Sequence, residues 1–188
     1  MAAQNRTPGQ PGQDDARHSR GPADAKVTLI EYLDYECPHS AEAEAPIRQV
    51  MEAFSGEVRL IVRQFPLGDI HENAELAAVA AEAAGNQGRF WEFHDRVFAR
   101  QNELGVDLVG EIVSELGLDP EKFARDLRDP ALAERVEEDQ SSGERLGVDS
   151  TPTVFVNGKV IQGRVSFVAL SRAVARLLVD SGDDIDAA

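Results

Sequence analysis

The order of the predicted elements indicates an α/β fold with one central sheet. A strand, a helix and a second strand follow one another within residues 26–65. A run of helices comes next, over about residues 71–147, and a hairpin and a last helix complete the pattern. Parallel strands need a crossover such as this first helix, and the crossover is right-handed in nearly all proteins. The helical run is therefore predicted to be an insertion into the sheet unit.

The strand–helix–strand unit is predicted from apolar runs and their flanking residues. Residues 26–33 (KVTLIEYL) and 57–65 (EVRLIVRQF) are short and rich in β-branched side chains, as buried strands are. Between them, Pro38 suits the first turn of a helix and Gly56 suits its exit.

The later elements follow from periodicity and turn residues. Residues 71–88 are Ala-rich and residues 89–101 carry a broad aromatic face, which includes Trp91 as a core residue. Residues 151–163 (TPTVFVNGKVIQG) are typical of a hairpin whose type I′ turn is Asn-Gly. Ser166 is expected to cap the last helix.

The two ends of the chain differ from this pattern in composition. Residues 1–24 have almost no large apolar side chain and are predicted to be a disordered tail, and residues 181–188 are predicted to be an acidic tail. The folded domain is then expected over residues 25–180. Since the first residues lack the apolar core of a secretory signal, a cytoplasmic location is predicted for the chain as written. An extracytoplasmic location applies if a targeting segment is missing.

The charge and hydropathy of the chain argue against binding to nucleic acid and insertion into a membrane. The chain has 188 residues and a formal net charge of −15, which disfavours nucleic acid. No apolar run approaches the length of a membrane-spanning helix, so membrane insertion is not expected. The sequence does not indicate the oligomeric state.

Cys37 is the only cysteine. A single cysteine excludes an intrachain disulfide and a zinc site built from several cysteines. The four histidines show no metal-ligand spacing, so no metal site is expected, and no bound cofactor is predicted. Cys37 lies between a strand and the start of a helix, where backbone N–H groups and the helix dipole stabilise a thiolate. The alternative is a free cysteine that packs as a small apolar residue.

Three motifs in one order resemble the DsbA-like thioredoxin-fold proteins. They are the turn YLDYECPHS (32–40), the helical stretch that begins at Phe65, and LGVDSTPTVFVNGKVIQG (146–163). The resemblance covers about residues 24–178. It implies a thioredoxin-like fold with an all-helical insertion, and a cis peptide bond between Thr151 and Pro152.

The resemblance also implies a function, that of a thiol–disulfide oxidoreductase. Cys37 and Pro38 match the start of the C-P-x-C site, where the first cysteine is the exposed nucleophile, and His39 matches the variable position. Ser40 stands where the resolving cysteine is expected, so the chain is either a monothiol form or a variant whose resolving cysteine has been replaced. A mixed disulfide on Cys37 must then wait for an external thiol such as glutathione.

Other residues of the site have predicted roles. The Ser40 hydroxyl is expected to donate a hydrogen bond to the Cys37 sulfur. His39, when protonated, would favour the thiolate, or it is only a solvated ring. Glu31 shares a strand face with apolar residues, so burial should raise its pKa, and the family keeps a buried acid at this spacing. Asp34 and Glu36 are interpreted as solvated.

The substrates implied are proteins or peptides with thiols or disulfides, and glutathione. Thr151 and Pro152 would offer a backbone edge to an extended peptide. Two other functions stay open. One is a glutathione-dependent transferase or isomerase of the kappa type, although Cys37 replaces the usual serine of that class. The other is a non-enzymatic peptide-binding module.

Overall fold

The computed structural model describes residues 17–180. The strands are β1 (Ser19–Arg20), β2 (Val27–Leu33), β3 (Val58–Gln64), β4 (Thr153–Val156) and β5 (Lys159–Val160). The helices are α1 (Pro38–Ala53), α2 (Ala74–Gly85), α3 (Phe90–Ala99), the 3-10 helix η1 (Gln101–Glu103), α4 (Val106–Glu115), α5 (Pro120–Asp126), α6 (Pro130–Arg145) and α7 (Phe167–Asp180).

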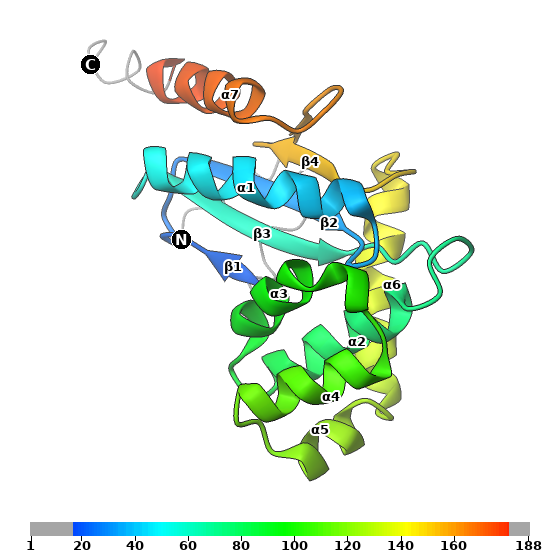
Figure 1. Ribbon diagram of the computed structural model, residues 1–188. Helices are drawn as coiled ribbons and strands as arrows, with labels where there is room; N and C mark the ends of the chain where they lie inside the picture. The colour runs from blue at the N-terminus through cyan, green and yellow to red at the C-terminus, as the bar shows by residue number, and fades with distance from the viewer. Residues whose placement is uncertain (1–16, 181–188) are drawn as a thin grey trace, which may run out of the picture.

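One mixed sheet lies at the centre, with the strand order β1-β3-β2-β4-β5. Strands β2 and β3 are parallel over their full length, from Val27 opposite Val58 to Leu33 opposite Gln64. The predicted parallel unit is therefore confirmed. Strand β4 pairs antiparallel to the other side of β2. Helices α2 to α5 form a block at one side of the sheet, while α7 lies on the opposite side, next to α1 (Figure 1).

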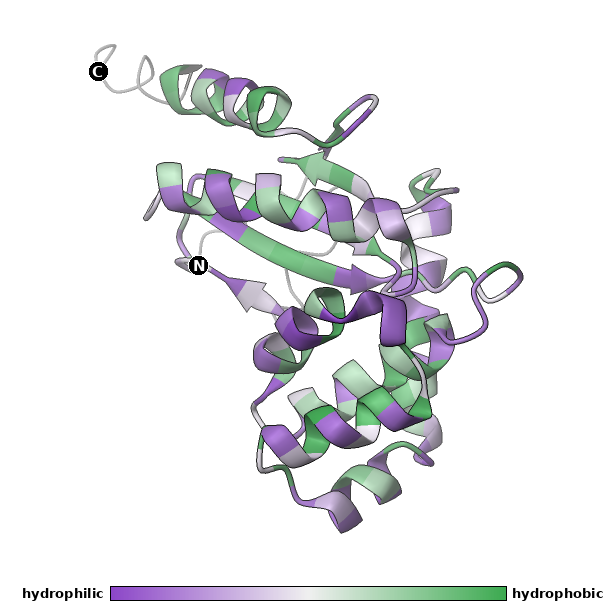
Figure 2. Cartoon of the chain, in the orientation of Figure 1, coloured by the Kyte–Doolittle hydropathy of each residue, from purple (hydrophilic) through white to green (hydrophobic). Residues whose placement is uncertain are grey.

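The alternation of side chains along β2 builds a core on each face of the sheet. Val27, Leu29 and Leu33 join the larger core, which includes residues of α1, α7 and the helical block. Ile30 and Tyr32 point to the other face and pack there with Phe65 and Phe155. Hydrophobic residues are accordingly concentrated in the middle of β3 and along β4 (Figure 2).

Strand β4 continues into the predicted hairpin. The turn residues Asn157 and Gly158 have φ values of 44° and 78°, and a type I′ turn requires positive φ at both positions. The Asn157 side chain accepts a hydrogen bond from the Thr28 N–H at 2.7 Å and donates to the Lys26 carbonyl at 3.1 Å. The turn is thus tied to the start of β2. Ser166 caps α7, since its Oγ accepts from the Ala169 N–H at 3.3 Å.

Between residues 71 and 147, the described chain contains helices and no strand. The Ala-rich face of α2 is fully buried, and its small side chains let neighbouring helices approach closely. No helix within residues 17–180 is long and apolar enough to cross a membrane.

The prediction of a disordered tail up to residue 24 is wrong for its second part. Strand β1 pairs antiparallel with β3, with Ser19 opposite Ile61. The His18 ring is buried, stacks on Phe90 at 3.5 Å, and its Nε2 lies 2.6 Å from Glu82 Oε1. The polar residues Ser19 and Arg20 can form this strand because their backbone pairs with β3, while the ring of His18 just before them packs on the helical block. The rest of the predicted tail, residues 1–16, and the acidic tail lie outside the described residues.

Candidate active site

Cys37 is the N-cap residue of α1, and Pro38 is the first helical residue. Strand β2 ends four residues earlier, so the strand delivers Cys37 to the start of the helix. The cysteine is buried, with 5% of its surface exposed, whereas Pro38 and His39 are exposed. The resemblance predicted an exposed nucleophile, and the structure instead places Cys37 just below the surface. Its sulfur lies at the N-terminal end of α1, where the helix dipole favours an anion.

The cysteine contacts the loop before β4. The thiol of Cys37 donates a hydrogen bond to the Thr151 carbonyl, with Sγ and the oxygen 3.3 Å apart. Thr151 is itself buried, and the peptide bond that follows it, to Pro152, is cis. Two segments 114 residues apart in the sequence therefore meet at the sulfur.

A groove of about 460 Å³ lies beside this contact. It is lined by His39, Glu42, Ala43, Ser150, Thr151, Pro152, Gly163, Arg164 and Val165. The walls thus come from the start of α1, the loop before β4 and the loop before α7. The groove brings His39 and the predicted substrate-binding pair, Thr151 and Pro152, together.

Ser40 differs from its predicted role. Its side chain is fully buried, and its hydroxyl accepts a hydrogen bond from the Asp34 N–H at 3.3 Å. Within the described residues, the sulfur of Cys37 bonds to the Thr151 carbonyl and not to Ser40. The hydroxyl therefore supports the turn before the cysteine, because Asp34 follows the last residue of β2 and its N–H needs a partner outside the sheet.

His39 lies at the rim of the groove, with three quarters of its side chain exposed to solvent. Its Nδ1 is 3.7 Å from Glu42 Oε2 on the next turn of α1. At this distance and exposure the pair is weak. The ring can still approach a bound substrate from the open side of the groove.

Glu31 is completely buried in β2. Neither of its carboxylate oxygens has a hydrogen-bond partner within residues 17–180. Burial raises its pKa well above the ordinary range, and the nearby Glu44 raises it further. Glu31 is thus a buried acid, as its position on an apolar strand face predicted.

Glu44 also contacts His94, which is buried. Its Oε2 lies 3.2 Å from Nε2 of His94, whose Nδ1 lies 3.2 Å from the Tyr35 hydroxyl. The ligand atoms of Glu44, His94 and Asp95 are within 4.8 Å of one another, so these three residues could hold a cation, which the histidine spacing did not predict. Asp95 already pairs with Arg20 at 2.7 Å.

Asp34 and Glu36 are not the solvated residues that the sequence suggested. Asp34 is almost fully buried and accepts hydrogen bonds from the N–H groups of Glu36 and Leu67, at 2.8 and 2.9 Å. Its Oδ2 also lies 2.8 Å from Nδ1 of His71. The carboxylate of Glu36 binds the backbone and side chain of Asn73, at 2.6 and 3.1 Å. Both acids therefore fasten the turn before Cys37 to the loop that leads into the insertion.

Gln101 is a site residue that the sequence did not indicate. Its Nε2 donates to the carbonyl of Tyr35 at 2.8 Å and to the carbonyl of Cys37 at 2.9 Å. Gln101 begins η1 in the insertion, more than sixty residues from both partners. No local pattern marks such a contact, because only the packing of the insertion creates it.

Comparison with known proteins gives the family. The family model described as thioredoxin matches residues 13–176. A thioredoxin-like oxidoreductase from Silicibacter pomeroyi DSS-3 is 29% identical, with a TM-score of 0.76 over 87% of this chain and 94% of that chain. BdbD from Bacillus subtilis in its oxidised form is 25% identical, with a TM-score of 0.80 over 90% and 96% of the two chains.

Similar sequences also occur within longer proteins. A Na(+)/H(+) antiporter, NhaA 1, of Salinispora arenicola is 44% identical over 87% of this chain, and one of Herminiimonas arsenicoxydans is 43% identical over 78%. The chain spans only about a quarter of the length of these relatives (25% and 23%). The antiporter activity in their names therefore describes the full-length proteins.

The fold alone is shared more widely. The thiol-disulfide exchange protein alpha-DsbA2 from Wolbachia pipientis is 22% identical and has a TM-score of 0.78 over 87% and 88% of the two chains. The family match, the parallel β2–β3 pair with its helical insertion, and these neighbours agree with one another. The chain belongs to the thioredoxin family, and its structural neighbours are DsbA-like thiol-disulfide oxidoreductases.

Proposed function

We propose that the chain exchanges thiols and disulfides through Cys37 alone. The observation that carries this proposal is the meeting of three features at one sulfur. Cys37 caps the N-terminus of α1, its Sγ lies 3.3 Å from the Thr151 carbonyl before the cis-proline, and a groove opens beside that loop. A helix N-terminus supports the thiolate, which is the attacking species in thiol–disulfide exchange.

The first step is an exchange with a substrate disulfide. The Cys37 thiolate attacks one sulfur, a Cys37–substrate disulfide forms, the substrate S–S bond breaks, and the other substrate sulfur leaves as a thiolate. Thr151 and Pro152 provide the edge on which an extended peptide can pair, and His39 stands at the open rim of the groove. Because Cys37 is nearly buried, the peptide must displace the thiol from the Thr151 carbonyl.

The second step needs an external thiol. A serine hydroxyl is scarcely ionised at neutral pH and does not form a stable S–O bond, so Ser40 cannot release the substrate. A glutathione thiolate can attack the substrate sulfur, which forms a glutathione–substrate disulfide and returns the Cys37 thiolate. The predicted cytoplasmic location would supply this thiol. No net oxidant or reductant is consumed in the two exchanges.

Glu31 is proposed to hold and release a proton during the thiol exchange at Cys37. It is a buried acid with no partner in the described structure, and it lies in the strand that leads to Cys37. Its raised pKa lets it hold a proton at pH values where a solvated glutamate would not.

The experiment is intact-mass analysis after incubation with a peptide that contains one disulfide. We expect one peptide adduct per chain, which glutathione removes, and none on Cys37→Ser. The absence of an adduct on the wild-type chain would contradict the proposal. If Cys37→Ser still bound the reduced peptide with unchanged affinity while no adduct ever formed, the peptide-binding module would be the better account.

The kappa-type alternative has its own readout. A glutathione-dependent transferase would join glutathione to an aromatic electrophile in an adduct that absorbs light. We expect no rate above that of the reaction without protein, because Cys37 stands where that class carries serine.

A further inference from the structure

Two backbone carbonyls beside the reactive cysteine point at one side-chain amide. The Tyr35 carbonyl lies in the turn before Cys37, and the Cys37 carbonyl begins the hydrogen bonding of α1. Both accept a hydrogen bond from Nε2 of Gln101, at 2.8 and 2.9 Å. A glutamine amide nitrogen carries two hydrogens, so the two carbonyls use its full donor capacity.

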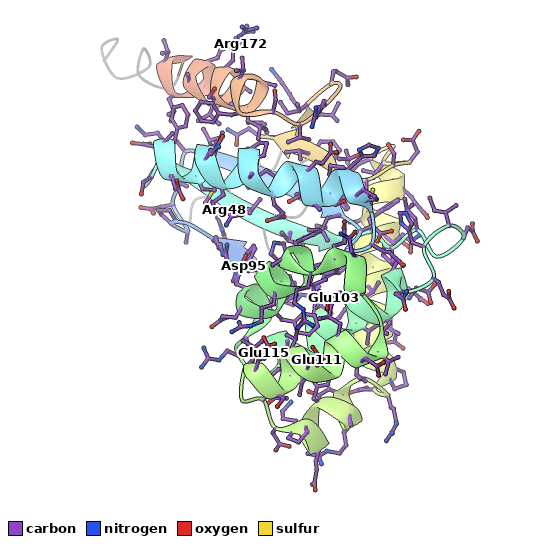
Figure 3. All side chains as sticks on the ribbon, viewed as in Figure 1. Arg48, Asp95, Glu103, Glu111, Glu115 and Arg172 are labelled. Atoms are coloured by element: carbon purple, nitrogen blue, oxygen red, sulfur yellow. The ribbon has the colours of Figure 1, made fainter. Side chains whose placement is uncertain are left out.

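The position of Gln101 is itself fixed. The preceding residue, Arg100, pairs with the carboxylates of Glu103, Glu111 and Glu115 at 2.8, 2.6 and 3.3 Å. These three acids lie close together beside α3 and α4 (Figure 3). A network of several charges holds geometry better than an isolated surface pair does. The ion pairs of Arg100 therefore hold the neighbouring Gln101 in place within the insertion.

One of the two carbonyls that the amide binds belongs to Cys37 itself. The Cys37 carbonyl already accepts the N–H groups of Ser40 at 3.0 Å and Ala41 at 3.3 Å, as the first turn of α1 requires. Carbonyl oxygens carry partial negative charge, which opposes a thiolate nearby. The N–H groups of Gln101 offset the partial negative charge of both oxygens. They also fix the turn so that the N-terminus of α1 faces the sulfur.

We propose that Gln101 is a positioning residue for Cys37, through which the helical insertion stabilises the thiolate. This inference rests on the thiol exchange proposed above. Gln101 touches no reacting atom in the structure and acts through the carbonyls of Tyr35 and Cys37. The insertion is thus a working part of the site in addition to a cover for the sheet edge.

The test follows the thiolate by its ultraviolet absorbance across pH, together with the rate of adduct formation on a small aromatic disulfide. For Gln101→Ala we expect the midpoint of both curves to rise by about 0.5–1 on the pH scale, which lowers the thiolate fraction below the midpoint roughly three- to tenfold. The rate there should fall by about two- to fourfold, because the thiolate of a weaker acid is the better nucleophile. The rate plateau at high pH should rise by about 1.5- to 3-fold, because the thiolate of a weaker acid is the better nucleophile.

Gln101→Glu separates electrostatics from packing. It keeps the size of the side chain but removes both donors, so its midpoint should rise at least as much as that of Gln101→Ala. A role in packing alone would leave this variant like the wild type.

Gln87→Ala is the matched control. Gln87 donates to the Asp119 carbonyl at 3.2 Å and accepts from the Asp119 N–H at 2.9 Å, so it also makes two backbone contacts, but within the insertion. Its midpoint should equal that of the wild type. Wild-type midpoints in both Gln101 variants would overturn the inference, whether or not their stability falls. A wild-type chain that fails to react at all would instead overturn the proposed function.

Discussion

Two buried acids that precede Cys37 have opposite environments, Glu31 within β2 and Asp34 directly after it. Asp34 accepts two backbone N–H groups and faces His71 at 2.8 Å, so its charge is compensated. Glu31, three residues earlier, has no hydrogen-bond partner within residues 17–180. An uncompensated buried carboxyl is costly to ionise. Asp34 therefore builds the site, while Glu31 weakens the fold whenever it carries a charge.

Glu31→Gln should stabilise the protein relative to the wild type by an amount that grows as the pH rises. Because the folded-state pKa of Glu31 is raised, the folded protein holds this proton to higher pH than the unfolded chain, whose pKa is about 4.3. The contribution of Glu31 to stability is present at low pH and is lost as pH rises through the folded pKa. Between the two pKa values, the unfolding equilibrium constant should rise about tenfold for each step of one in pH. The difference in the free energy of unfolding, variant minus wild type, should therefore increase from about pH 4.5 upward.

Urea unfolding at several pH values measures this difference. Glu52→Gln, at an exposed position of the same helix as Glu44, serves as the control and should give a flat difference. A flat profile for Glu31→Gln as well would mean that Glu31 is not a buried acid with a raised pKa.

The two acids also show what a sequence can reveal at this scale. The burial of Glu31 could be predicted because its strand alternates in a regular way, with Leu29 and Leu33 on the same face. Asp34 could not be placed, since its partners Leu67 and His71 are 33 and 37 residues away. The Ser40 hydroxyl was predicted to reach the sulfur and instead accepts from the Asp34 N–H. A hydroxyl can rotate toward several partners, and the sequence does not rank them.

Helix α6 covers the face of the sheet opposite α1, and a glycine allows this contact. A Cβ at Gly143 would lie 2.9 Å from Phe65 Cε2 and 3.0 Å from Tyr32 Cδ1. Both rings are buried in the smaller core, so neither can move away freely. The Tyr32 hydroxyl further bonds to Ser142 Oγ at 2.8 Å. The helix therefore rests directly on the sheet beneath the active-site turn.

This contact predicts opposite effects for two glycine substitutions. Gly143→Ala should lower the free energy of unfolding by about 1–3 kcal/mol, because overpacking outweighs the helix propensity of alanine. Gly110→Ala in α4, where no atom lies within 4 Å of a new Cβ, should raise it by about 0.5–1 kcal/mol. Urea unfolding of both variants checks the pair. Stabilisation by Gly143→Ala would show that α6 packs less closely than described.

Helices and strands could be predicted from the sequence where an element has its own apolar pattern or turn residues. The parallel pair, the Asn-Gly hairpin and the helical run all have one or the other. Strand β1 consists only of Ser19 and Arg20, and no apolar alternation can mark two polar residues. Its pairing depends on the edge of β3 and on the indole of Trp91, which donates to the Ser19 carbonyl at 3.2 Å.

In the whole molecule, the insertion and the sheet unit are joined by polar contacts as well as by the core. From the insertion side, Gln101 binds the carbonyl of Cys37 and Asn73 binds the carboxylate of Glu36, so both hold the turn before α1. His18, just before β1, reaches Glu82 in α2, and both side chains are almost fully buried. Removing one partner of a buried charged or polar pair leaves the other desolvated and uncompensated.

His18→Ala should therefore lower the free energy of unfolding by about 3–5 kcal/mol. In the double variant His18→Ala/Glu82→Gln, part of this loss should be regained, since a neutral amide costs less to bury than a carboxylate. Thermal unfolding of the two single variants and the double variant completes the cycle. Strictly additive losses would indicate that the residues do not interact in solution.

The central claim is that Cys37 forms disulfides with substrates and that Ser40 alone prevents their release. The most direct measurement is single-turnover mass analysis of the wild-type chain and Ser40→Cys, each with a disulfide peptide and without glutathione. The wild type should accumulate the peptide adduct. Ser40→Cys should pass through the same adduct, release the reduced peptide and end two hydrogens lighter, with a disulfide between positions 37 and 40. A wild-type chain without an adduct, or a Ser40→Cys variant that stays trapped, would contradict the account.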